Sequence, residues 1–146
     1  MNRATDGGSF HDQPVHGWPR RRMIMSCDAS KGPLLTRYYL IGSSSSRYAL
    51  YLHHLHVSDE ERALHDHPFG FVTFLLSSGY WEITPWGRHW RRRFSLLYRH
   101  AEWAHRLELV RPTWTLVLRL RRVREWGFYT PGGWQDWVAY GKEWCD

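Results

Sequence analysis

The stretch Leu64-His65-Asp66-His67-Pro68 decides how the rest of this sequence is interpreted. Side chains two positions apart lie on the same face of an extended chain, so His65 and His67 can direct two imidazole nitrogens at one ion. Two ligands alone hold an ion weakly. A third is expected from His105, which begins a later segment with the composition of a strand. The sequence therefore predicts a divalent metal ion on three histidines.

Short segments rich in β-branched, aromatic and other apolar residues surround this stretch. Turn-forming sequences separate several of them, as in Gly42-Ser43-Ser44-Ser45-Ser46 and Ser77-Ser78-Gly79. Such segments, at intervals of about ten residues and without a long helical period, are typical of an all-β antiparallel sandwich or barrel. We expect strands at 34–41, 48–56, 71–76, 80–84, 93–98, 105–109 and 113–120.

The length of 146 residues fits one domain. Residues 1–33 are polar, contain Gly and Pro, and carry the basic run Arg20-Arg21-Arg22. They predict an extended or partly ordered arm, with a short strand possible at 23–25, and residues 34–146 form the β-domain. An apolar run long enough for a membrane span is missing, and the two cysteines, Cys27 and Cys145, suggest no disulfide framework. We expect a cytoplasmic protein that does not enter the membrane.

The region around the two closely spaced histidines resembles the first motif of the cupin superfamily. That motif reads Gly, five residues, His-x-His, three or four residues, Glu, six residues, Gly. His65, His67 and Gly79 match it, whereas Asp59 stands at the opening glycine and Val72 at the glutamate. The resemblance implies a single-domain antiparallel β-barrel, or jelly roll.

The second cupin motif is matched only at His105. Other residues replace its remaining markers, namely Phe94, His100, Glu102 and Leu109. Together with Arg124-Glu125-Trp126-Gly127-Phe128, the matching residues also look like a group of small, poorly characterised bacterial and phage cupin-like proteins. Cupin-like barrels often pair through edge strands, so the resemblance implies a homodimer.

The missing glutamate at Val72 bears on the chemistry that the resemblance implies. It leaves a neutral three-histidine site, which resembles that of the thiol dioxygenases within the superfamily. Those enzymes use ferrous iron, so Fe is the expected metal, with Zn, Ni or Mn as alternatives. We predict a non-haem iron dioxygenase acting on a small polar or anionic molecule. A non-catalytic ligand-binding or sensor barrel and a metal-dependent isomerase or epimerase remain open alternatives.

Three further histidines lie in one expected strand. Alternation places His54 and His56 on one face and His53 on the other, and the sequence does not tell which face is interior. We expect His53 to be a possible fourth ligand or to support a ligand, since the similar small proteins tend to carry Tyr-Leu-His there.

Charged residues offer other candidates. Arg106, beside His105, is a candidate to bind an anionic substrate. Three carboxylates could orient an imidazole or act as a base, but we interpret each as part of a solvated strand face: Glu82, Glu102 and Glu108.

The net charge of +6 comes almost entirely from arginine, and tryptophan accompanies much of it. Bases can stack on aromatic rings beside a positive groove, so single-stranded nucleic acid is a possible partner. We favour a plainer interpretation, in which arginine stems cover exposed rings through cation–π contacts. The clusters contain Trp86, Arg88, Trp90, Arg91, Arg92 and Arg93, and then Arg119, Arg121, Arg122 and Arg124.

Overall fold

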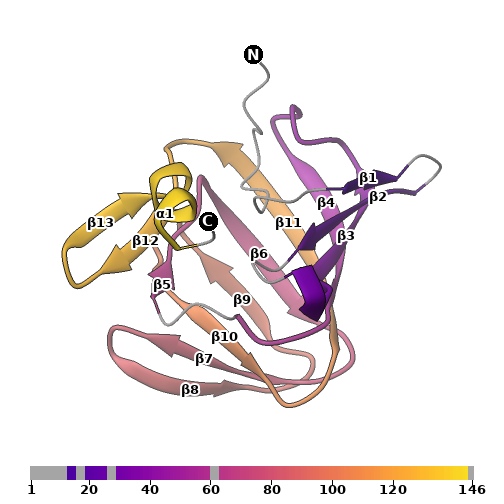
Figure 1. Ribbon diagram of the computed structural model, residues 1–146. Coiled ribbons are helices and arrows are strands. Elements are labelled where there is room, and N and C mark those ends of the chain that lie inside the picture. The colour runs from indigo at the N-terminus through magenta and orange to yellow at the C-terminus, as the bar shows by residue number, and fades with distance from the viewer. Residues whose placement is uncertain (1–12, 16–18, 26–28, 60–62, 145–146) are drawn as a thin grey trace.

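Antiparallel strands make up most of the computed structural model, which describes residues 13–15, 19–25, 29–59 and 63–144 (Figure 1). The described residues also form a short 3-10 helix, Ala29–Lys31, and one α-helix, α1, Trp137–Trp144. The predicted all-β fold is confirmed.

The largest sheet has seven strands in the order β1-β2-β3-β4-β11-β6-β9. Every described neighbour pair in it is antiparallel. Its strands are β1 Gln13–Val15, β2 Arg20–Met25, β3 Pro33–Ile41, β4 Ala49–Leu55, β11 Thr113–Arg122, β6 Phe69–Leu75 and β9 Leu96–Arg99.

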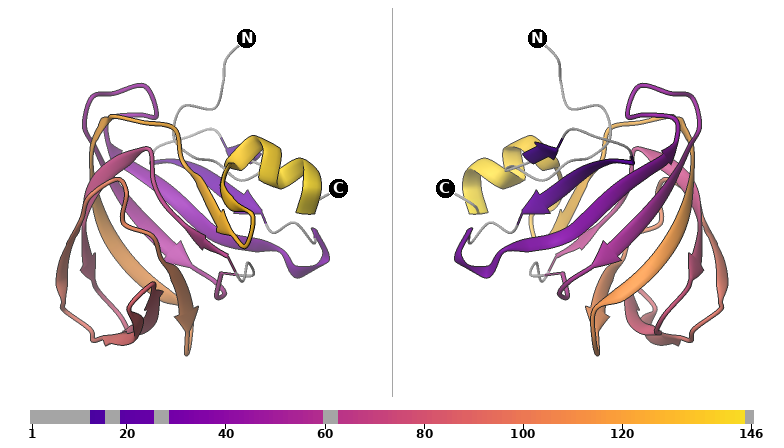
Figure 2. Two further views of the ribbon diagram at one scale, coloured as in Figure 1. Left: turned by 90° about the vertical axis from the view of Figure 1, so that its left-hand side faces the viewer. Right: turned by 90° about the vertical axis from the view of Figure 1, so that its right-hand side faces the viewer.

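Two three-stranded sheets complete the architecture, in the orders β10-β7-β8 and β13-β12-β5. In Figures 1 and 2, α1 lies beside β12, well away from the β7-β8 hairpin. The strands are β10 Arg106–Leu109, β7 Tyr80–Thr84, β8 Gly87–Arg91, β13 Gly133–Asp136, β12 Gly127–Thr130 and β5 Leu64–His65.

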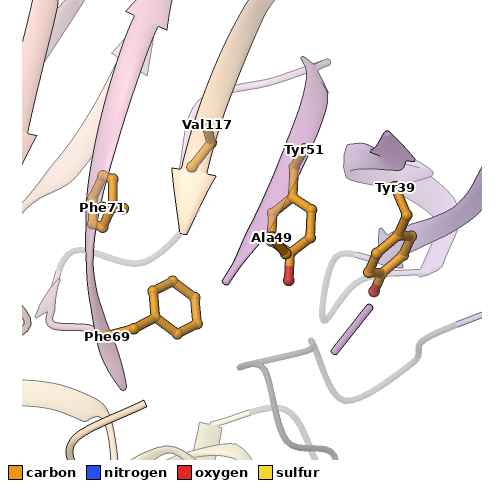
Figure 3. Close-up of a cluster of buried hydrophobic side chains, with 6 residues drawn as sticks. All are labelled: Tyr39, Ala49, Tyr51, Phe69, Phe71 and Val117. Carbon is orange, nitrogen blue, oxygen red and sulfur yellow. The ribbon is translucent and has the colours of Figure 1, made fainter. Parts of the chain in front are cut away.

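Strict alternation of buried and half-buried residues runs along β6 and β7, as expected for strands with one face in the core. Aromatic rings fill much of that core, and the rings of Tyr39 and Tyr51 meet edge to face at 5.1 Å. Burying each such side chain stabilises the fold by about 1.5 to 3 kcal/mol. Figure 3 shows the cluster, which consists of Tyr39, Ala49, Tyr51, Phe69, Phe71 and Val117.

The predicted N-terminal arm contributes to the large sheet. Within residues 1–33, β1 pairs with β2, and β2 pairs along its length with β3. Ile24 on β2 is buried and lines the cavity described below. The boundary at residue 34 stays a prediction, but residues 20–25 pack as part of the β-structure.

Strand β8 and the C-terminal elements were not among the expected strands. Strand β8 is mostly exposed and polar, so it lacks the alternation that predicts a strand. Helix α1 begins after Asp136, whose Oδ1 accepts hydrogen bonds from the amides of Val138 and Ala139 at 2.9 and 3.1 Å. Among the described helices, none has the length and apolar character needed to cross a membrane.

Candidate metal centre

Backbone pairing brings the two histidine motifs together. The amide of His65 donates to the carbonyl of His105 at 2.9 Å, and the amide of His105 donates back at 3.0 Å. The amide of His67 donates to the carbonyl of Ala101 at 2.9 Å. Segments forty positions apart in the chain therefore lie directly against each other.

The three imidazoles converge on one point. Each of His65, His67 and His105 offers a ring nitrogen, and these nitrogens lie within 4.8 Å of one another. The Nε2 atoms of His67 and His105 are 3.3 Å apart. Two nitrogens bound to one ion at about 2.1 Å lie about 3.0 to 3.4 Å apart for octahedral to tetrahedral angles. The spacing of the His67 and His105 nitrogens therefore fits joint coordination of one metal ion.

Burial keeps two of these histidines in the neutral form that a metal ligand needs. Desolvation lowers the pKa of His65 to about 4, and the nearby carboxylate of Asp59 only partly offsets it. Desolvation, together with His105 and His65, holds the pKa of His67 well below its usual range. The lone pairs are therefore available at neutral pH.

Glu82 fixes the orientation of His105. Its Oε1 lies 2.7 Å from Nδ1 of His105, and both side chains are buried. The carboxylate can only accept, so Nδ1 carries the proton and Nε2 turns its lone pair toward His67. This arrangement, a carboxylate behind a histidine, selects the tautomer suited to metal binding.

Besides His105, three residues donate hydrogen bonds that hold Glu82 as a carboxylate. Arg91 donates to Oε2 at 2.7 Å, Arg99 donates to both oxygens at 2.9 and 2.6 Å, and the indole of Trp103 donates to Oε1 at 3.0 Å. Burial raises the pKa of Glu82, but hydrogen bonds from His105 and Arg99 outweigh it and leave the pKa well below its usual range. The interpretation of Glu82 as a solvated residue is wrong, since it is only 1% exposed. Glu82 lies two residues after Tyr80 on β7 and therefore on the same face, and this spacing was the signal available in the sequence.

Asp66, between the two ligands of the first motif, is fully buried. Its Oδ1 accepts the amide of Gly127 at 2.8 Å, and its Oδ2 accepts from Tyr129 at 3.1 Å and Trp134 at 3.0 Å. Arg124 pairs with the same oxygen. The C-terminal segment thus anchors the backbone that presents His65 and His67.

A phenylalanine stands where the superfamily motif has its glutamate. Val72 lies on the other face of β6 from Phe71, because the strand alternates. With the shorter motif spacing of three residues, Phe71 takes the glutamate position. Its ring lies 4.6 Å from that of His67 and lines the cavity. The described metal-binding group therefore consists of three histidines beside an aromatic ring.

The sequence left open whether His53 or the pair His54 and His56 faces the interior. The structure places His53 on the interior face of β4. His53 lines the same cavity but is not part of the three-histidine group, and its Nε2 accepts a hydrogen bond from Nε of Arg37 at 3.0 Å. His54 faces the other way and stacks on Trp114 at 4.1 Å. Nε2 of His56 lies 2.8 Å from the hydroxyl of Thr36.

Arg106 follows His105 in the chain but does not line the cavity. Its Nη1 pairs with Glu108 at 2.9 Å, and Glu108 also accepts from Arg88 at 3.2 Å. Glu102 is exposed. The interpretation of Glu102 and Glu108 as part of the polar surface agrees with these positions.

The arginine clusters are largely engaged within the fold. The guanidinium of Arg88 lies 3.9 Å from the ring centre of Trp81. Arg119 is buried and donates to the carbonyls of Ser43 and Ser46 at 3.0 and 2.6 Å. Arg91 and Arg124 pair with Glu82 and Asp66, a role that neither interpretation of the clusters included. Binding of nucleic acid stays a prediction.

The three histidines line a cavity of about 250 Å³. Apolar side chains form most of its wall, among them Leu35, Leu55 and Leu107. The polar groups in the wall include Asp59 and Arg37. Small-molecule sites usually have such a wall with a few convergent polar groups, and this volume suits a small metabolite.

Several solved structures resemble this chain in fold. DMSP lyase DddQ from Ruegeria pomeroyi DSS-3 gives a TM-score of 0.53 at 17% identity, over 75% of this chain and 56% of that one. The polyketide cyclase RemF from Streptomyces resistomycificus gives 0.50 at 14% identity, over 62% and 71%. A sugar phosphate isomerase from a cupin superfamily, from Silicibacter pomeroyi DSS-3, gives 0.49 at 13% identity, over 70% and 74%.

No protein-family model matches the chain, and no curated protein does. At these identities the structural likeness concerns the fold alone. The likeness to the lyase and the cyclase agrees with the predicted antiparallel β-fold. The chemistry rests on the residues of this chain.

Proposed function

We propose that this cupin-like chain is a non-haem iron dioxygenase that acts on a small polar or anionic molecule. One observation carries the proposal: three imidazoles converge in the wall of a largely apolar cavity, with Phe71 in place of a fourth protein ligand. A neutral three-histidine site leaves coordination positions open to small molecules. The choice of iron follows the resemblance to three-histidine thiol dioxygenases.

Each part of the chain has a distinct task in this proposal. His65, His67 and His105 would hold the ion, and Glu82 keeps the lone pair of His105 directed at it. A ferrous ion supplies the redox chemistry and the open positions for substrate and dioxygen. The largely apolar wall lowers the polarity beside the ion, which strengthens electrostatic interactions there.

Elemental analysis of protein purified without chelator tests the metal centre. We expect about one equivalent of iron or another divalent transition metal in the wild type, and losses of tenfold or more in His65→Ala, His67→Ala and His105→Ala. His54→Ala is the matched control, because His54 lies on the opposite face of β4 from the cavity. Full metal content in all three variants would contradict the proposal.

Oxygen consumption tests the activity. We expect the iron-loaded wild type to consume dioxygen with at least one member of a panel of thiols, phenols and amino acids. Zinc-loaded protein and iron-treated His105→Ala serve as controls and should consume none. If no substrate supports uptake while iron is bound at the three histidines, the chain is a ligand-binding barrel and not a dioxygenase.

A metal-dependent isomerase or epimerase is the second candidate, and Asp59 favours it. This carboxylate lines the cavity, and its Oδ2 accepts the amide of Leu107 at 2.6 Å, which fixes its position. An isomerase needs a base beside its metal ion. Exchange of substrate carbon-bound hydrogen with deuterated water, lost in Asp59→Asn, would favour this candidate. Oxygen uptake that survives in Asp59→Asn would favour the dioxygenase.

The proposal includes a cytoplasmic homodimer. Among the described strands, β9 ends the seven-stranded sheet, and its Leu96 and Tyr98 are 71% and 59% exposed. An edge strand presents unpaired backbone groups, and a second copy of the same edge can satisfy them across a two-fold axis. Light scattering should give twice the chain mass for the wild type and a smaller mass for Leu96→Asp. A monomeric wild type would contradict the proposed homodimer.

A further inference from the structure

A buried tyrosine hydroxyl belongs to the cavity wall. Tyr80 on β7 is only 4% exposed, lines the cavity, and packs in a core cluster with Leu55 and Leu75. Among the residues that the structure describes, none forms a hydrogen bond with its hydroxyl. A buried hydroxyl without a partner costs free energy, so one in a cavity wall is placed to bind a polar group of a ligand.

Tyr80 lies close to the candidate metal centre and keeps its proton. Glu82, the carboxylate behind His105, is two residues further along the same face of β7, which is about 7 Å along the strand. Burial and then the charge of Glu82 raise the pKa of Tyr80, and Arg99 and Arg91 offset this only in part. The hydroxyl is therefore a neutral donor at physiological pH.

A carboxylate approaches the same part of the wall from the other edge of β10. The amide of Asp59 donates to the carbonyl of Leu107 at 2.9 Å, and its Oδ2 accepts the amide of Leu107 at 2.6 Å. Along β10, Leu109 pairs with Tyr80. Besides burial, the charge of Asp59 acts on the pKa of both His65 and Tyr80, so Asp59 lies near both groups. The described residues add no other hydrogen bond to this carboxylate.

The charges in the wall favour an uncharged ligand group at this place. The carboxylate of Asp59 repels an anion, and the neutral hydroxyl of Tyr80 does not compensate for that repulsion. An ammonium group would share the cavity with the buried guanidinium of Arg37 and, in the proposed function, with a divalent ion. An alcohol accepts one hydrogen bond and donates another, so it matches one donor and one acceptor without adding charge.

We infer that the cavity binds a small uncharged alcohol, whose oxygen accepts a hydrogen bond from the hydroxyl of Tyr80 and whose proton is donated to the carboxylate of Asp59. The inference names the substrate class of the proposed enzyme, and any reaction of that alcohol rests on the proposed function. Binding of the alcohol does not, because it needs no metal ion.

Binding of straight-chain alcohols, from butan-1-ol to octan-1-ol, to chelator-treated protein tests the inference. NMR titration would compare each alcohol with its isomeric methyl ether, which keeps the acceptor oxygen and lacks the hydroxyl proton. The amine and the carboxylic acid of the same chain length complete the series. We expect at least one alcohol to bind about threefold or more tightly than these three compounds, as one additional hydrogen bond predicts.

Three results for the wild type would overturn the inference. They are equal affinity for alcohol and ether, tighter binding of the amine or the acid, and no binding of any alcohol.

Variants locate the two groups. Tyr80→Phe removes the donor, so the affinities for alcohol and ether should both fall about threefold or more. Asp59→Asn should lose the preference for alcohol over ether, and the exposed control Tyr98→Phe should change neither affinity. Unchanged binding in folded Tyr80→Phe, or an unchanged preference in folded Asp59→Asn, would also overturn the inference. The wild-type comparison decides even if a variant fails to fold.

The inference and the proposed function fail separately. If the histidines bind no metal, the preference for alcohol over ether should persist, because it is measured without metal. If that preference is missing while iron binds at the histidines, the metal centre stands and the alcohol is the wrong substrate class.

Discussion

Two buried carboxylates support the candidate metal centre in different ways. Glu82 contacts a ligand directly, through Nδ1 of His105, and sets the direction of its lone pair. Asp66 lies between two ligands in the chain but turns away to the C-terminal segment, where it binds Gly127 and Arg124. The comparison indicates that Glu82 tunes the ligand, whereas Asp66 holds the backbone that carries the ligands.

The largest effect is expected from Asp66→Asn. The side-chain amide of asparagine would place its N–H groups against the groups that donate to Asp66, and Arg124 would lose its buried charge partner. We therefore expect a loss of about 3 to 5 kcal/mol in the free energy of unfolding. Urea denaturation measures it. Asp136→Asn is the control, because asparagine also caps helices well. A loss below about 1 kcal/mol would show that Asp66 does not anchor this segment.

Glu82→Gln should affect metal binding more specifically. It removes the charged acceptor of His105, and the affinity for Zn²⁺ or Fe²⁺ should fall about 10- to 100-fold in protein that is still folded. Competition with a coloured chelator measures this affinity. Glu102→Gln, at an exposed position, is the control. Unchanged affinity in Glu82→Gln would remove the distinction between the two carboxylates.

A smaller effect is expected from pH in the metal-free protein. The pKa of His65 is lowered by burial from 6.5 to about 4. Between these values the unfolded chain binds more protons than the folded chain, so stability falls as the pH decreases from about 7 to 4. His65 should contribute a loss on the order of 1 kcal/mol by about pH 5. Urea midpoints with chelator present should show a weaker pH dependence in His65→Gln than in wild type.

Exposed His100→Gln provides the comparison for that series and should keep the wild-type pH dependence. An equal slope in His65→Gln and wild type would mean that His65 titrates normally in the folded protein.

The smallest effect concerns a single donor to Asp66. Trp134→Phe removes an indole N–H 3.0 Å from Oδ2, but Trp134 is 42% exposed and other donors to Asp66 remain. We expect a loss of about 0.5 to 1 kcal/mol in unfolding free energy. Trp86→Phe, at a more exposed position, should change stability by less than about 0.5 kcal/mol. If Trp134→Phe lost as much unfolding free energy as Asp66→Asn, the remaining donors to Asp66 would not share its stabilisation as a network.

Local patterns were enough to predict the β-fold and the pairing of His65 with His67 on one face, whereas His105 was expected from its place in a later segment and from the resemblance to the second cupin motif. Period-two alternation identifies β6 and β7, and the spacing of His65 and His67 places them on one side of an extended chain. Such signals involve residues close in sequence, and so they are visible without the structure. Strand β8 lacks alternation, since it is mostly exposed, and for that reason it was missed.

The supporting groups depend on contacts that no local pattern records. Asp66 lies inside the decisive stretch, yet its partner Arg124 is 58 positions away. The choice between His53 and His54 depends on which face of β4 is covered, and a shift of one residue would reverse it. Arg37 becomes a cavity residue only once β3 lies beside β4.

Anomalous diffraction from crystals of the protein loaded with Co²⁺ or Fe²⁺ would test the metal centre most directly. We predict one strong peak at the metal absorption edge, about 2.1 Å from a ring nitrogen of each of His65, His67 and His105. A peak elsewhere with these three imidazoles free of metal, or none at full occupancy of added metal in solution, would contradict the account.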